Sequence, residues 1–163
     1  MDEFEAWARG RTASLSRAAY LLTGDLQRAE DLVQETLIRV AGHWRRISRS
    51  GEPDAYARTV LHRLAVDSWR RQRARPTEVS AEHPELGVAG PDVERRLLVR
   101  EALLRLTPRQ RAVLVLRYLD DLTEVQTAAV LGCSPNTVKS QARQALARLR
   151  DLAPDLLAEL EVR

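Results

Sequence analysis

The sequence predicts an all-α protein made of two small helical domains joined by a flexible linker. Apolar residues recur at steps of three and four in both halves of the chain, and no stretch suggests a strand. Hydrophobic residues make up 44% of the 163 residues but aromatic residues only 4%, which favours helices packed around small Leu, Val and Ala cores. The stretch 76–91 is rich in Pro and Gly and has no period, so we place domains at 1–75 and 92–163.

Three helices are predicted in the first domain. Residues 15–44 show helical spacing, and "TGD" at 23–25 divides them, with Gly24 ending one helix and Asp25 capping the next. A turn cluster at 48–54 precedes a third helix over about 54–73, which ends in the basic run "WRRQRAR". The polar residues opposite the apolar stripe of the second helix are Arg28, Asp31, Gln34, Glu35 and Arg39.

The second domain is predicted to hold four helices that end in a helix-turn-helix. "TPRQ" opens the second of them, because Thr107 can cap and Pro108 suits the first helical position. Asp120 and Asp121 follow this helix, where we expect one of them to serve as an N-cap. A short helix then runs to residue 131, Gly132 ends it, and Ser134 caps the last helix.

The last helix has one apolar and one polar face. Its apolar side chains, which we expect to pack on the domain core, are Val138, Ala142, Ala145, Leu146 and Leu149. The alternative, a polar face that meets only water, is weakened because no carboxylate occurs from 134 to 150 and a helix N-terminus favours phosphate. The side chains predicted to contact DNA are Asn136, Thr137, Lys139, Ser140, Arg143 and Gln144.

Other sequence features bear on where in the cell the protein is expected and on whether it could be an enzyme. Cys133 is the only cysteine, so no internal disulfide can form; it fits a reducing cytoplasm and a packing role. No stretch approaches the roughly 18 apolar residues of a membrane span, and the acidic N-terminus lacks the apolar run of a signal peptide. His43, His62 and His83 have no metal-ligand spacing, and no phosphate loop or nucleophile motif occurs. We therefore expect a cytoplasmic protein that is not an enzyme and needs no cofactor.

"AEDLVQETLIRV" at 29–40 and "LTPRQRAVLVLRYLDDLTEVQTAAVLGCSPNTVKSQARQALARLR" at 106–150 form a recognisable pair. They resemble regions 2 and 4 of an extracytoplasmic-function (group 4) sigma factor of bacterial RNA polymerase, closest to the actinobacterial type. The resemblance covers nearly the whole chain except the linker and the last dozen residues. It implies a protein that binds core RNA polymerase and directs initiation at promoters with −10 and −35 elements.

The resemblance also implies roles for particular residues. Asp31, Gln34 and Glu35 would bind core polymerase, although Glu35 could instead pair with Arg39 one turn away. The loop at 47–54 and the polar face of the third helix would open and read the −10 element. That face offers Arg58, His62, Arg63, Arg70 and Arg71, with the last two positioning phosphates. The −35 element would meet the recognition helix of region 4.

Three residues depart from the family pattern. Asn136 stands where Gly is common before "TVKS", which predicts an altered −35 preference. Arg63 replaces a frequent Asn of the −10 helix, and Gln126 replaces a frequent Glu in the first helix of the turn motif.

A rival interpretation is a stand-alone helix-turn-helix regulator, which would explain 106–150 but leave "DLVQE" without a role. Such regulators usually dimerise, whereas two different modules suit a monomer on the polymerase. The compact two-domain form would also permit an anti-sigma factor as a partner.

Overall fold

The computed structural model describes residues 2–73 and 91–154, and every element in them is helical. The first module consists of α1 (Asp2–Thr23), α2 (Leu26–Ser50) and α3 (Pro53–Arg73). Gly24 takes the positive φ of 69° that ends α1, and the Asp25 carboxylate accepts a hydrogen bond from the Arg28 N–H at 2.9 Å. Both predictions for this turn are confirmed. None of the helices in the described residues combines the length and apolar character that a membrane span requires.

The first helix begins earlier than the apolar pattern indicated. Phe4 and Trp7 pack on Trp44 of α2, with ring centroids 5.4 and 5.5 Å apart. The Trp7 indole donates to the Asp54 carboxylate at 2.7 Å, and Arg11 forms an ion pair with the same carboxylate at 2.7 Å. Asp54 lies in the first turn of α3, so these contacts join α1 to the start of that helix.

The second module contains α4 (Pro91–Leu104), α5 (Pro108–Leu114), α6 (Glu124–Leu131) and α7 (Pro135–Leu152). A π-helical turn, η1 (Val115–Leu119), continues α5. Thr107 and Thr123 form capping boxes with Gln110 and Gln126, and Ser134 caps α7. The prediction that Asp120 or Asp121 would cap the next helix is therefore wrong, because Thr123 supplies the capping oxygen.

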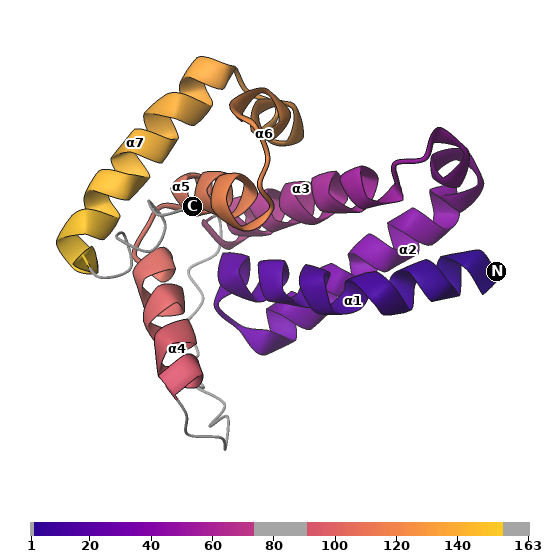
Figure 1. Cartoon of the computed structure of the whole chain (residues 1–163), viewed down its shortest axis with the longest axis horizontal. Helices are drawn as coiled ribbons and strands as arrows, with labels where there is room; N and C mark the ends of the chain where they lie inside the picture. The colour runs from indigo at the N-terminus through magenta and orange to yellow at the C-terminus, as the bar shows by residue number, and fades with distance from the viewer. Residues whose placement is uncertain (1, 74–90, 155–163) are drawn as a thin grey trace.

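The two modules pack directly on one another. Figure 1 shows the second module gathered at one end of the three-helix bundle, with α5 and α6 beside α3. Ala112 of α5 and Val115 of η1 belong to the same buried cluster as the core of α1, α2 and α3. The predicted linker at 76–91 falls almost entirely on 74–90, outside the described residues.

One boundary differs from the prediction. We expected the −10 loop at 47–54, but α2 continues through Ser50 and Ile47 is buried in the core at 5% exposure. Gly51 ends the helix with a positive φ of 77°, which leaves a connection of only Gly51 and Glu52 before α3. The connection is therefore too short to hold a large loop on this face.

Candidate nucleic-acid interface

The last helix, α7, presents a clean division between core and surface. Val138, Ala145 and Leu149 are 0–2% exposed, and Ala142 and Leu146 are half-buried beside them, as expected. The Ser134 hydroxyl accepts from the Thr137 N–H at 3.1 Å, which fixes the start of the helix. The predicted DNA-contacting side chains that are exposed are Asn136, Lys139, Ser140, Arg143 and Gln144, while Thr137 is half-buried in the cap.

Two contacts modify this face. Glu124 of α6 lies 3.6 Å from the Lys139 ammonium, so a carboxylate reaches the helix from a neighbouring element although none occurs within 134–150. The Gln144 side-chain oxygen accepts from Gln110 at 3.4 Å, which ties Gln144 toward α5. Asn136 and Arg143 make no side-chain hydrogen bond or ion pair within the described residues, and neither does the shorter Ser140. They are therefore the side chains best placed to meet a groove.

The polar face of α2 has the exposure that a docking surface needs. Asp31 and Gln34 are exposed, and the Glu35 carboxylate forms an ion pair with Arg39 at 2.9 Å. The pairing of Glu35 with Arg39, one of the two interpretations above, is therefore present. Asp31 and Glu35 also line a hollow of about 430 Å³ between α2 and α3, with Arg71 on its other wall. Arg71, a candidate for DNA binding, therefore lies close to Asp31 and Glu35, the candidates for polymerase binding.

The five candidate residues on α3 do not share one face. Arg63, Arg70 and Arg71 are exposed, with Arg71 turned toward α2. Arg58 and His62 point instead toward the second module, where each lies 3.5 Å from the Asp120 carboxylate. Helical spacing alone does not distinguish these directions, because it cannot indicate which side of α3 a second module covers.

His62 is the clearest correction. We expected it on an exposed face, but its ring is fully buried at 0% exposure. Among the described residues neither ring nitrogen has a hydrogen-bond partner. Burial lowers the pKa of His62 below its usual 6.5, and the nearby Asp120 only partly opposes that shift. His62 is therefore held neutral and out of reach of DNA in this arrangement.

Arg111 is a residue that the sequence pattern did not single out. Its guanidinium donates to the Leu22 carbonyl at 2.5 Å and to the Leu103 carbonyl at 2.9 Å, and it lies 5.5 Å from the Trp69 ring centroid. Helix C-termini have carbonyls without intrahelical partners, so one buried cation satisfies the ends of both α1 and α4. Burial lowers its pKa to about 10, which keeps it charged at neutral pH. The position of Arg111 directly before the apolar run "AVLVL" was the available signal.

Arg100 makes a parallel contact from α4. Its Nε donates to the Gly24 carbonyl at 3.1 Å, a second nitrogen donates to the same oxygen, and the guanidinium lies 5.3 Å from the Tyr20 ring centroid. Two arginines of the second module therefore bind backbone carbonyls of the first.

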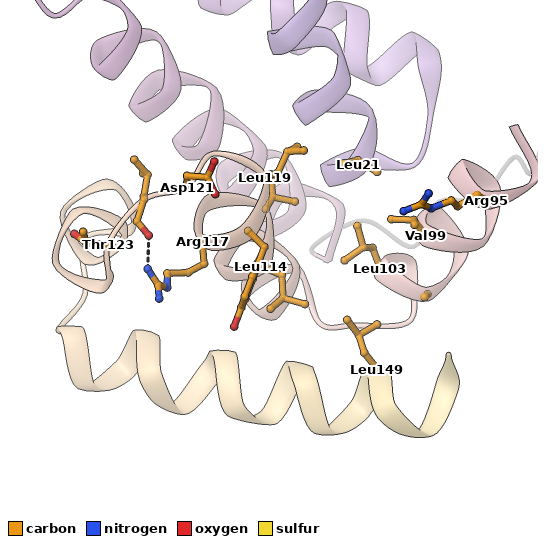
Figure 2. A pocket seen from close by; sticks show the side chains of 14 residues that line it. Leu21, Arg95, Val99, Leu103, Leu114, Arg117, Leu119, Asp121, Thr123 and Leu149 are labelled. Atoms are coloured by element: carbon orange, nitrogen blue, oxygen red, sulfur yellow. Dashed lines mark hydrogen bonds between the residues drawn. The ribbon is translucent and has the colours of Figure 1, made fainter. Parts of the chain in front are cut away.

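Beside these contacts the junction leaves an apolar hollow of about 520 Å³. Figure 2 shows Leu21 of α1, Val99 and Leu103 of α4, and Leu149 of α7 around it. Arg117 lies at the opposite side, where it donates to the Leu122 carbonyl. The modules therefore meet through specific polar contacts, while part of the apolar surface between them is not in contact.

Comparison with known proteins agrees with the division of the chain into two modules. Residues 8–75 match the family model of Sigma-70 region 2, and residues 96–149 match that of Sigma-70, region 4. The two matched segments in this order define a sigma factor with a helix-turn-helix in its second part. The chain belongs to the extracytoplasmic-function sigma factors of the sigma-70 family, which act in transcription initiation and are not enzymes.

Curated relatives cover most of the chain. The RNA polymerase sigma-E factor of Streptomyces coelicolor is 39% identical over 151 residues, which span 91% of this chain and 85% of that protein. The ECF RNA polymerase sigma factor SigL of Mycobacterium tuberculosis is 36% identical over 146 residues, spanning 85% and 81%.

A solved structure has the same fold. The sigma factor RpoE from Bartonella quintana, crystallised with the anti-sigma factor NepR, has a TM-score of 0.74 and 25% identity, covering 95% of this chain and 99% of that one. The structure of CnrH with the cytosolic domain of CnrY, with a TM-score of 0.62 and 22% identity, supports the fold alone.

Proposed function

We propose that this sigma factor docks on core RNA polymerase through the polar face of α2 and recognises two promoter elements with its two modules. The docking residues are Asp31, Gln34 and Glu35. The −35 element is read by α7 in the major groove, and the −10 element is contacted by the arginines of α3. The exposed polar face of the capped α7, which carries no carboxylate of its own over residues 134–150, is the single observation that carries the proposal.

The partners follow from these surfaces. Core polymerase and promoter DNA are the two that the family requires. Because RpoE was crystallised with an anti-sigma factor, we extend that class of partner to this chain as well. A stand-alone regulator would need α7 but would leave the exposed acidic face of α2 without a role.

Reconstitution with core RNA polymerase and a promoter library tests the proposal. Initiation should depend on this chain and select promoters with two separated elements. Asp31→Asn and Gln34→Ala should weaken binding to core enzyme, whereas Glu30→Gln, an exposed change on the same helix, should not. Tight promoter binding by the chain alone, without any initiation when core enzyme is added, would favour the stand-alone regulator.

A further inference from the structure

The Asp120 carboxylate is held against the side of α3 that carries Arg58 and His62. The π-helical turn η1 ends with the Asp120 N–H donating to the Val115 carbonyl at 3.0 Å, and Asp121 follows with a positive φ of 51°. This geometry directs Asp120 toward α3 while Asp121 remains exposed. Arg58 Nε lies 3.5 Å from Asp120 Oδ2, and His62 Nε2 lies 3.5 Å from the same oxygen.

The contact is partly shielded from solvent. The Asp120 side chain is 19% exposed and that of Arg58 is 30% exposed. His62 beneath them is neutral because it is buried, so Arg58 is the positive charge that faces Asp120. A carboxylate in this position pairs with a guanidinium that could otherwise bind a phosphate, since carboxylate and phosphate are both anionic oxygen acceptors.

The rest of the junction keeps Asp120 in place. Arg111 and Arg100 bind the carbonyls at the end of α1, and Ala112 and Val115 are buried in the core of the first module. These contacts hold α5 and η1 against the bundle, as Figure 1 shows for α5 and α3. Asp120 is therefore presented to Arg58 by a packed junction and not by a loose surface chain.

We propose that Asp120 is an intramolecular latch, which holds Arg58 in a closed form of the free chain and competes with nucleic-acid phosphate for that arginine. The inference rests on the proposed function, because it takes Arg58 to be a DNA contact. A ligand can shift this equilibrium only by binding the open form more tightly. DNA does so when its phosphate needs the guanidinium that pairs with Asp120.

The latch predicts a change of domain separation that can be measured without DNA. Spin labels at Ala41→Cys and Arg148→Cys, both exposed, would report the distance between α2 and α7 in a Cys133→Ser background. The parent chain should show mainly one short distance. Asp120→Asn should raise the ratio of open to closed chains about three- to tenfold, within the range of a partly exposed charge pair. Asp121→Asn is the matched control, because it removes the same charge and Asn tolerates positive φ.

Competition is tested with an oligothymidylate of about 12 nucleotides. Asp120→Asn should bind it several-fold more tightly than the parent, while Asp121→Asn should show only a weak effect. In an Arg58→Ala background, Asp120→Asn should give no more gain than Asp121→Asn. Equal gains in oligothymidylate affinity from Asp120→Asn and Asp121→Asn would show that Asp120 does not compete with phosphate for Arg58.

The two proposals fail in different ways. If the parent chain is already open, or if Asp120→Asn leaves the distances unchanged, the latch is wrong whatever Arg58 does. If Asp120→Asn opens the chain but Arg58→Ala leaves transcription by the reconstituted holoenzyme unchanged, then the DNA role of Arg58 is wrong and the competition falls with it.

Discussion

The polar side chains on α7 were assigned from spacing, and their contacts with neighbouring helices now distinguish them. Lys139 and Gln144 have partners on α6 and α5, at 3.6 and 3.4 Å, whereas Asn136 and Arg143 extend from the exposed face. A side chain that already has a partner loses that contact when it binds DNA. The strongest discrimination among bases should therefore come from Asn136 and Arg143.

Arg143→Ala should cost about 1–3 kcal/mol in binding of the preferred −35 sequence over a mismatched one, since a bidentate base contact contributes that much. Arg148→Ala, an exposed change further along α7, should weaken all sequences similarly if it has any effect. Competition binding by the holoenzyme to promoter fragments with single −35 substitutions measures both variants. Unchanged discrimination in Arg143→Ala would remove its role in reading bases.

His62 makes stability depend on pH. Burial lowers its pKa below 6.5, so the unfolded chain takes up a proton that the folded chain resists. Its stabilising contribution is complete above pH 6.5 and decreases as the pH falls below that value toward the folded pKa, by at most about 1.4 kcal/mol per pH unit.

Urea unfolding between about pH 7.5 and 5.5 tests this, the range in which His titrates. His62→Gln should flatten the dependence, whatever its effect on absolute stability. His43→Gln, on the exposed face of α2, should keep the slope of the parent chain. An unchanged slope in His62→Gln would show that the buried ring is not its source.

Among the elements, the turn between α1 and α2 carries an unusual constraint. Gly24 has a φ of 69°, and a Cβ at this position would lie 2.4 Å from Leu104 Cδ2 of α4. The turn is thus both a helix end and a contact between the modules. Capping chemistry predicted the first property, but only the packing of α4 reveals the second.

Gly24→Ala should lower the free energy of unfolding by about 1–3 kcal/mol, through the strained backbone and the contact with Leu104. Gly10→Ala is the matched control: it lies within α1 with nothing within 4 Å of the added Cβ. That change should raise stability by about 0.5–1 kcal/mol. Denaturant unfolding measures both, and equal effects of the same sign would contradict the assignment.

For the whole molecule, Arg111 joins the modules by binding carbonyls at the ends of α1 and α4. Arg111→Met should remove the guanidinium from these carbonyls and cost about 2–4 kcal/mol of stability. Arg109→Met, an exposed change on the same helix, should stay within about 0.5 kcal/mol.

Two spectroscopic signals can distinguish the unfolding of the first module from that of the whole chain. All three tryptophans, Trp7, Trp44 and Trp69, lie in the first module, so their fluorescence reports its unfolding, whereas circular dichroism reports all helices. The two transitions should coincide in the parent chain and separate in Arg111→Met. Transitions that remain coincident, with stability unchanged, would show that Arg111 does not couple the modules.

By itself the sequence determined the helical class, the helix-turn-helix and most helix caps. These depend on local spacing and on residues such as Gly24, Thr107 and Ser134, whose conformations and hydrogen bonds involve near neighbours in the chain. The polar faces of α2 and α7 were predictable for the same reason, since a helix fixes which side chains share a side.

Only the tertiary structure decided how the two modules meet and what that contact does to the candidate sites. The buried His62, the pairing of Arg58 with Asp120 and the carbonyls bound by Arg111 join residues that are far apart in the chain. Spacing within one helix cannot indicate which side a second module will cover. Burial and charge pairing between distant segments are properties of packing, and they turned part of a predicted DNA surface into the junction between the modules.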